Sequence, residues 1–245
     1  MKHIFLTSDI GAYRKIDGKK IPCAFSNENG LVDQIKKCIE RKDIFVFVAS
    51  NPEGFEKTDS YARIIIESFA LAGLNFNECI VIDNRNKLNL EELIQKAGVV
   101  YLAGGHVPTQ NAFIKSIGLD ILLSNYDGVV IGQSAGSMNL AKTVYNYPED
   151  SSEIEDPKFL EGMSLTNLSI VPHFNLEKGN EQVEEGIDLM DDYLLKDSHK
   201  VPLYCVTNGS HIYVNENRTK FYGDIYLIEK GEISKVNKDI VLEKN

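Results

Sequence analysis

The stretch GVVIGQSAGSMNLA (residues 128–141) decides the fold that we expect for this chain. An apolar run, residues 128–132, stops at Gly-Gln-Ser-Ala-Gly, and a segment that can form a helix follows it. In an open α/β sheet, ligands bind beyond the carboxyl ends of the strands, which is where Ser134 would lie. The pattern G-x-S-x-G fits a sharp strand-to-helix turn that lifts a serine hydroxyl clear of the sheet. The stretch therefore predicts a buried strand, a tight turn at Ser134 and a helix.

Similar apolar runs recur along the first part of the chain, with helical patterns between them. The expected strands are residues 3–7, 44–50, 79–83, 99–105 and 128–132. The expected helices are residues 28–41, 59–72, 88–97 and 109–117, the last of them with a Thr109 cap. Such alternation is typical of a parallel sheet covered on both faces. We therefore expect an α/β fold with a doubly wound, mostly parallel sheet.

The pattern changes after about residue 145. Residues 145–158 are acidic and loop-like, residues 168–174 form another expected strand, and residues 179–195 fit an acidic helix. Residues 204–236 alternate apolar and polar side chains between turn signals, which predicts antiparallel strands. Since no repeat or flexible linker interrupts the chain, we interpret residues 1–245 as a single α/β domain with antiparallel C-terminal strands.

Composition and charge narrow the classes of function. Hydrophobic residues make up 43% and charged residues 25% of the chain, which is ordinary for a soluble protein. The net charge of -10 argues against nucleic acid or an anionic membrane surface as a partner. No apolar run approaches the ~18 residues of a membrane span, and the N-terminal segment lacks the pattern of a signal peptide. The cysteines show no CxxC spacing, so we expect a reduced, cytoplasmic protein.

A nucleophilic serine needs a base and an oxyanion site. The backbone N–H of Ala135, at the start of the expected helix, is placed to receive an oxyanion above Ser134. His106 and His173 both follow expected strands, so either could be the base. We favour His173, because a histidine directly after a glycine turn more often positions a loop or binds substrate. The histidines and acids show no metal-ligand spacing such as H-E-x-x-H, so we expect no metal and no other cofactor.

Three strand ends together resemble one family. A strand ending AGG (103–105), one ending GQSAGS (132–137) and one ending PHF (172–174) are similar to the peptidase E family, or aspartyl dipeptidases, with cyanophycinases as relatives. The resemblance extends from residue 1 to about residue 215. It implies the fold of the class I glutamine amidotransferases and a serine peptidase of small peptides, with dipeptides that carry an N-terminal aspartate as one option. Those amidotransferases have cysteine at the strand-to-helix turn, which is called the nucleophile elbow. This chain has Ser134 there, so amidotransferase chemistry is disfavoured.

The resemblance also implies roles for individual residues. Ser134 matches the family's nucleophile, and His173 matches the general base. Gly105 matches one backbone donor of the oxyanion hole, and Ala135 supplies the second. These roles together describe hydrolysis of a peptide through a Ser-His nucleophile pair.

The substrate-binding turn departs from the family. The family's GGGNTF-like stretch here reads GGHVPT (104–109), in which Gly104 and His106 are expected to contact the substrate. An arginine would be the natural partner for a substrate carboxylate, through two parallel hydrogen bonds. The segment after the PHF motif, residues 175–186, has none. The resemblance therefore does not extend to strict specificity for N-terminal aspartate.

Two residues are candidates for the group that orients His173. Asp150, in YPED (147–150), lies where one family acid falls in the loop after the elbow helix. Asn208, in TNG (207–209), takes the place of a second family carboxylate. A carboxylate fixes the tautomer of the ring and stabilises the imidazolium, whereas an amide orients the ring without adding charge. Either Asp150 orients His173, or the chain is slow or inactive as a hydrolase.

This choice leaves alternatives open. The first is a catalytically weak or inactive pseudoenzyme that binds a small molecule on the same fold, which Asn208 favours. The second is an esterase of the α/β-hydrolase class, in which the histidine usually lies further along the chain from the nucleophile than His173 lies from Ser134. A homodimer is one option for the assembly.

Overall fold

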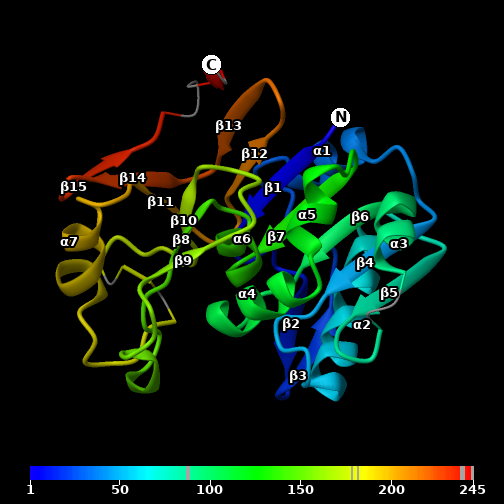
Figure 1. The fold of residues 1–245 in the computed structure, drawn as a ribbon, viewed down its shortest axis with the longest axis horizontal. Coiled ribbons are helices and arrows are strands. Elements are labelled where there is room, and N and C mark those ends of the chain that lie inside the picture. The colour runs from blue at the N-terminus through cyan, green and yellow to red at the C-terminus, as the bar shows by residue number, and fades with distance from the viewer. Residues whose placement is uncertain (87–88, 178, 181, 238–240, 244–245) are drawn as a thin grey trace.

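A central eight-stranded sheet crosses the molecule in the order β16-β13-β12-β1-β7-β6-β4-β5 (Figure 1). The computed structural model describes residues 1–245 except 87–88, 178, 181, 238–240 and 244–245. The parallel strands are β1 (His3–Thr7), β4 (Ile44–Val48), β5 (Glu78–Ile82), β6 (Ala97–Leu102) and β7 (Val129–Gln133). The antiparallel strands are β12 (His211–Val214), β13 (Arg218–Tyr222) and β16 (Val241–Glu243). The mixed, largely parallel α/β sheet is the predicted fold class.

Both faces of the parallel strands are buried, because these strands are apolar at almost every position. Phe45 and Phe47 point to one face, and Val46 and Val48 point to the other, as the pleat requires. The phenylalanine face is covered by α1 (Leu31–Cys38) and α2 (Phe55–Leu71). The valine face is covered by α3 (Leu90–Lys96), α4 (Val107–Ser116), α5 (Leu119–Ser124) and α6 (Ala135–Asn139). Helices on both faces confirm the expected double winding.

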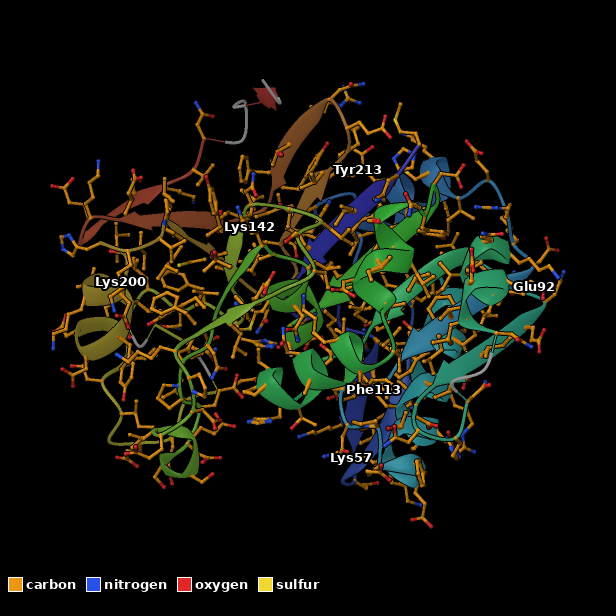
Figure 2. The ribbon with its side chains drawn as sticks, viewed as in Figure 1. Lys57, Glu92, Phe113, Lys142, Lys200 and Tyr213 are labelled. Atoms are coloured by element: carbon orange, nitrogen blue, oxygen red, sulfur yellow. The ribbon has the colours of Figure 1, made fainter. Side chains whose placement is uncertain are left out.

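The two faces form separate cores. Phe113 of α4 belongs to the core under the valine face, while Tyr213 of β12 belongs to the other (Figure 2). Charged side chains such as Glu92 and Lys200 project at opposite margins of the same view. Within the described ranges, no helix is long and apolar enough to cross a membrane. All four cysteines are free thiols.

The C-terminal third divides between two sheets, whereas the sequence predicted only a run of antiparallel strands. A four-stranded sheet has the order β10-β11-β14-β15. Its strands are β10 (Ser169–Val171), β11 (Leu203–Val206), β14 (Ile225–Glu229) and β15 (Glu232–Lys235). The chain leaves this sheet after β11 and enters the central sheet as β12, so residues 207–210 connect the two sheets.

The acidic helix predicted over residues 179–195 is wrong for most of its length. Among the described residues of that segment, a π-helical turn begins only at Met190 (Met190–Leu194) and continues into α7 (Leu195–Asp197). Gly186 has φ of 103°, a left-handed conformation that interrupts any right-handed helix. The periodicity of the apolar residues did not reveal this break.

Short elements were also missed. A hairpin of β2 (Tyr13–Ile16) and β3 (Lys19–Pro22) follows β1, and β8 (Thr143–Tyr145) pairs with β9 (Phe159–Glu161) beside the acidic loop. These strands are only three or four residues long, so the alternation of their side chains is too short to recognise in the sequence.

The N-terminal cap of α4 differs from the prediction. Thr109 lies inside the helix, and His106 caps it instead, because its Nδ1 accepts a hydrogen bond of 3.3 Å from the Thr109 N–H. A histidine ring nitrogen here accepts the hydrogen bond that a side-chain oxygen usually accepts at a helix N-cap. This contact fixes the position of His106 beside the glycine turn.

Candidate active site

The predicted turn is present at Ser134, between β7 and α6. Ser134 has φ of 50° and ψ of -116°, a strained conformation for a residue other than glycine. A Cβ on Gly132 would lie 2.6 Å from the Cα of Ser137, and one on Gly136 would lie 2.2 Å from the carbonyl oxygen of Leu102. Strand and helix can approach this closely only because both positions are glycine. The turn leaves the Ser134 side chain half-buried at the carboxyl edge of the sheet.

His173 reaches the serine from the second sheet. It follows β10 directly after Pro172, is 4% exposed, and has φ of 53°. Its Nε2 lies 2.9 Å from the Ser134 Oγ. That is hydrogen-bonding distance for a base that removes a serine proton. Of the two histidines that the sequence left open, the structure brings His173 to the hydroxyl.

Asn208, and not Asp150, lies at the other ring nitrogen of His173. The Oδ1 of Asn208 is 2.9 Å from His173 Nδ1. Asp150 is exposed, and its carboxylate accepts hydrogen bonds from the N–H and hydroxyl of Ser152 at 2.8 and 2.6 Å. These bonds lower the pKa of Asp150. The expected role of Asp150 is therefore replaced by a local one, since the residue caps the 3-10 turn Ser151–Glu153.

Of the two residues expected to form the oxyanion hole, Ala135 follows the serine directly, and Gly105 belongs to the glycine turn that packs against it. Ala135 is the first residue of α6, so its N–H has no acceptor inside the helix. A Cβ on Gly104 would lie 3.2 Å from the Ser134 Cβ, which places the glycine turn against the serine. Gly105 has φ of 151°, and a Cβ there would lie 2.4 Å from the Ser50 Oγ. The absence of a side chain at Gly104 thus leaves room for Ser134, and its absence at Gly105 leaves room for Ser50.

His106 lies beside the glycine turn, and residues of the acidic loop contact its ring. Its Nδ1 lies 2.7 Å from the Thr109 Oγ1, and its Nε2 lies 3.1 Å from Asp156. Glu153 is 3.8 Å from the same nitrogen. The ring therefore bridges the glycine turn and the acidic loop, and these contacts do not include Ser134.

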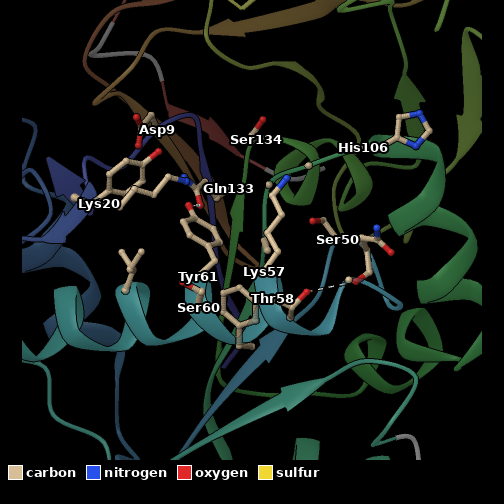
Figure 3. Close-up of a pocket in the computed structure, with 18 of the residues that line it drawn as sticks. Asp9, Lys20, Ser50, Lys57, Thr58, Ser60, Tyr61, His106, Gln133 and Ser134 are labelled. Atoms are coloured by element: carbon tan, nitrogen blue, oxygen red, sulfur yellow. Dashed lines mark hydrogen bonds between the residues drawn. The ribbon is translucent and has the colours of Figure 1, made fainter. Parts of the chain in front are cut away.

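A cavity of about 610 Å³ opens in front of Ser134 and His173. Figure 3 shows Lys57 extending from α2 toward Ser134, with Asp9 and Lys20 to one side. Lys20 comes from the β2–β3 hairpin, and its ammonium lies 4.5 Å from the ring centre of Tyr13. The cavity thus combines a nucleophile with charges of both signs. Sequence analysis did not find these charged residues, because the hairpin and the α2 face gave no motif.

Two tyrosine hydroxyls bind the side chain of Gln133, the residue before the nucleophile. The hydroxyls of Tyr61 and Tyr101 each donate to the Gln133 Oε1 at 2.6 Å. Burial raises the pKa of both tyrosines well above the usual value, so both keep their protons. Two neutral donors thus fix the Gln133 side chain in the wall of the cavity.

Ser8 is another site residue that sequence analysis missed. It follows β1, which pairs with β7 through Thr7 and Gln133, so it lies at the same edge of the sheet as Ser134. Its Oγ is 2.9 Å from the Asn208 Oδ1. The available signal was its position directly after a strand that neighbours the elbow strand.

Comparisons with known proteins agree with this geometry. Residues 22–222 match the model of peptidase family S51. A crystal structure of a peptidase from an acI-B1 Actinobacterium is similar with a TM-score of 0.64 at 13% identity, over 99% of this chain and 97% of the other. A putative peptidase E from Listeria monocytogenes EGD-e is similar with a TM-score of 0.59 at 16% identity, over 97% and 100% of the two chains. Comparison with curated proteins gives no significant match.

At these identities the solved structures establish the likeness of the fold. The family match covers most of the chain and includes the elbow, the PHF motif and the turn around Asn208. The chain is a serine-type peptidase, and it belongs to peptidase family S51.

Proposed function

We propose that the chain hydrolyses small peptides with Ser134 as nucleophile and His173 as general base. The observation that carries the proposal is the 2.9 Å contact between His173 Nε2 and Ser134 Oγ at a strained turn. The Ser134 hydroxyl attacks the substrate carbonyl while His173 takes its proton. The backbone N–H groups of Gly105 and Ala135 stabilise the tetrahedral oxyanion. His173 then protonates the leaving amine, and water releases the acyl group by the same steps in reverse.

The substrate that we propose is a short peptide, with dipeptides carrying an N-terminal aspartate as the first to test. The cavity of about 610 Å³ is the right size for a small ligand. Lys57 and Lys20 can attract a carboxylate in a protein whose net charge is -10. Asp9 can receive the ammonium group of a free N-terminus. A lysine is a less directional partner than the arginine that the family resemblance led us to seek.

The site of action that we propose is the cytoplasm. The free thiols of all four cysteines support a reducing compartment. The proposed hydrolysis requires no partner protein and no cofactor.

A catalytically weak, small-molecule-binding protein is the second candidate, and Asn208 is the observation that favours it. The amide beside His173 Nδ1 brings no charge to stabilise an imidazolium. The two candidate functions predict different reactivity for the Ser134 hydroxyl.

Labelling with a fluorophosphonate separates the two candidates. An activated Ser134 forms a stable phosphonyl ester, and Ser134→Ala abolishes both labelling and peptide hydrolysis. Ser124→Ala, which removes an exposed hydroxyl on α5, is the control and leaves both unchanged. Absence of labelling in the wild-type protein, with a small molecule still bound in the cavity, would establish the weak or inactive alternative.

A further inference from the structure

The hydroxyl of Ser8 connects two parts of the site. Ser8 is fully buried, with 0% of its surface exposed. The main-chain N–H of His173 donates to its Oγ at 2.6 Å, and the same Oγ lies 2.9 Å from the Asn208 Oδ1. Ser8 therefore contacts the backbone of the proposed base and the side chain that orients its ring.

The direction of each hydrogen bond follows from groups that can only donate. The His173 main-chain N–H is such a group, so it occupies a lone pair of Ser8. The Asp9 main-chain N–H is another, and it lies 3.3 Å from one end of the Asn208 amide, which must therefore be the oxygen. An amide oxygen only accepts, so the Ser8 hydroxyl donates its proton to it.

This arrangement sets the tautomer of His173. Its Nδ1 lies 2.9 Å from the same amide oxygen, so Nδ1 carries the ring proton in the neutral form. Nε2 is then the acceptor that faces the Ser134 Oγ. The Ser8 Oγ also lies 3.4 Å from Nδ1, a longer and weaker contact than the one it makes with Asn208.

A carboxylate at position 208 would not need this support. Both oxygens of a carboxylate accept, so either rotation keeps the proton on Nδ1. An amide turned by half a rotation would present its NH₂ group to Nδ1 and move the ring proton to Nε2. The ring could then no longer accept the proton of Ser134.

We propose that Ser8 is a positioning residue that, together with the Asp9 main-chain N–H, holds the Asn208 amide oxygen toward His173 and, through it, fixes the tautomer of the ring. The inference rests on the proposed function of His173 as the base. Ser8 itself touches no reacting atom. Its hydroxyl is a second donor to the Asn208 oxygen, and it strengthens an orientation that the Asp9 N–H selects and that a carboxylate has by itself.

The test is Ser8→Ala in two backgrounds, wild type and Asn208→Asp. We expect the rate of fluorophosphonate labelling to fall about tenfold in the wild-type background, because one of the hydrogen bonds that hold the amide is lost. In the Asn208→Asp background the same change should cost less than about threefold, since the carboxylate has no wrong orientation. Ser68→Ala is the control for loss of a buried hydroxyl. Ser68 is also 0% exposed, and within the described residues its Oγ has no hydrogen-bond partner.

Nitrogen-15 NMR of the histidine rings gives a readout that a purely structural role would not change. The wild-type signal of His173 should report a proton on Nδ1, and Ser8→Ala should shift the population toward Nε2. An unchanged tautomer, or an equal loss of labelling in both backgrounds, overturns the proposal. If Ser8→Ala does not fold, Ser8→Cys keeps the shape with a weaker donor and should show the same changes in smaller measure.

The NMR result also separates this inference from the proposed hydrolysis. A wild-type protein that is not labelled but shows the tautomer change with Ser8→Ala refutes the hydrolysis and supports the role of Ser8. A wild-type protein that is labelled, but whose His173 tautomer does not change with Ser8→Ala, supports the hydrolysis and refutes the role of Ser8.

Discussion

At the scale of single residues, the pair Asn208 and His173 determines how strong a base the site contains. The amide oxygen at 2.9 Å orients the ring but adds no charge. Replacement of Asn208 by aspartate adds a negative charge at that position without changing the length of the side chain. The change therefore tests how much of the chemistry depends on charge and how much on orientation.

Asn208→Asp should raise kcat on the order of tenfold to a hundredfold, because the carboxylate stabilises the imidazolium that forms during attack. The charge also favours the protonated ring in the free protein, so the acid limb of the pH–rate profile should move to higher pH. Steady-state kinetics from pH 5 to 9 would measure both effects. A fall in kcat together with an unmoved acid limb would mean that the amide is the better partner in this site.

Lys57 is the residue whose charge should select the substrate. Lys57→Gln should raise KM for peptides with an acidic side chain about threefold to fivefold, in the range expected for an exposed ion pair. The kcat value and the KM for neutral peptides should change less than about twofold. Lys37→Gln, which removes an exposed lysine from α1 outside the cavity, is the matched control. Equal effects of both variants would assign the loss to net charge and not to the cavity.

Sequence reasoning found the residues that belong to motifs and missed those that belong only to the fold. Ser134 and His173 were found because each ends a recognisable strand. Asp150 was a candidate because a family acid falls in the loop after the elbow helix, but its carboxylate accepts hydrogen bonds from Ser152 and remains at the surface. Ser8 and Lys57 carry no motif. Only the fold shows their relevance, because it pairs β1 with β7 and places Lys57 of α2 in the same cavity as the glycine turn.

At the scale of elements, the elbow depends on the close approach of α6 to β6. Gly136 faces the Leu102 carbonyl, and an added Cβ would lie 2.2 Å from that backbone oxygen. Because neither element has a flexible side chain at this contact, the backbone itself must move. A shift of α6 would also move the N–H of Ala135, which begins the helix.

Gly136→Ala should lower the free energy of unfolding by about 1–3 kcal/mol, the usual cost of an overpacked core. It should also reduce fluorophosphonate labelling, because the oxyanion donor moves with α6. Gly54→Ala is the control, since the nearest atoms to its Cβ would belong to the Asn51 side chain, at 3.3 Å. Urea unfolding measures the stability of both variants. A Gly136→Ala protein as stable as the control would show that the two elements separate without cost.

The parallel strands could be predicted because each is a continuous apolar run, and a sheet covered on both faces requires such runs. The strands after residue 145 were harder to predict, because they are short and divide between two sheets. Alternating residues predict a strand, but they do not say which sheet it joins. The helix predicted over residues 179–195 failed at Gly186, where a left-handed residue breaks an otherwise suitable periodicity.

At the scale of the whole molecule, the site lies where the two sheets meet. Ser8 and Ser134 follow strands of the central sheet, while His173 follows a strand of the second sheet. Asn208 lies in the connection from the second sheet to the central one, and the Gly209 N–H of the same turn donates to the Asp9 carbonyl at 3.0 Å. The geometry of the site therefore depends on the stability of the pairing between β12 and β1.

His211 is a buried group at that junction, and it should make the whole molecule sensitive to acid. It is 0% exposed on β12 opposite Thr7, and its ring stacks on Tyr222 with centroids 4.7 Å apart. Burial lowers the pKa of His211 from 6.5 to about 3. The unfolded chain therefore binds one more proton than the folded chain between these values, so stability falls as the pH drops through this window.

We expect His211 to remove about 2 kcal/mol from the free energy of unfolding between pH 7.5 and pH 5.0. His211→Phe keeps a stacked ring but cannot be protonated, so its stability should fall less over the same interval by about that amount. His199→Gln removes an exposed histidine and should follow the wild-type protein. Urea unfolding at the two pH values measures all three proteins. If His211→Phe loses as much stability as the wild type, the ring is protonated without disturbing β12, and the acid sensitivity arises elsewhere in the sheet.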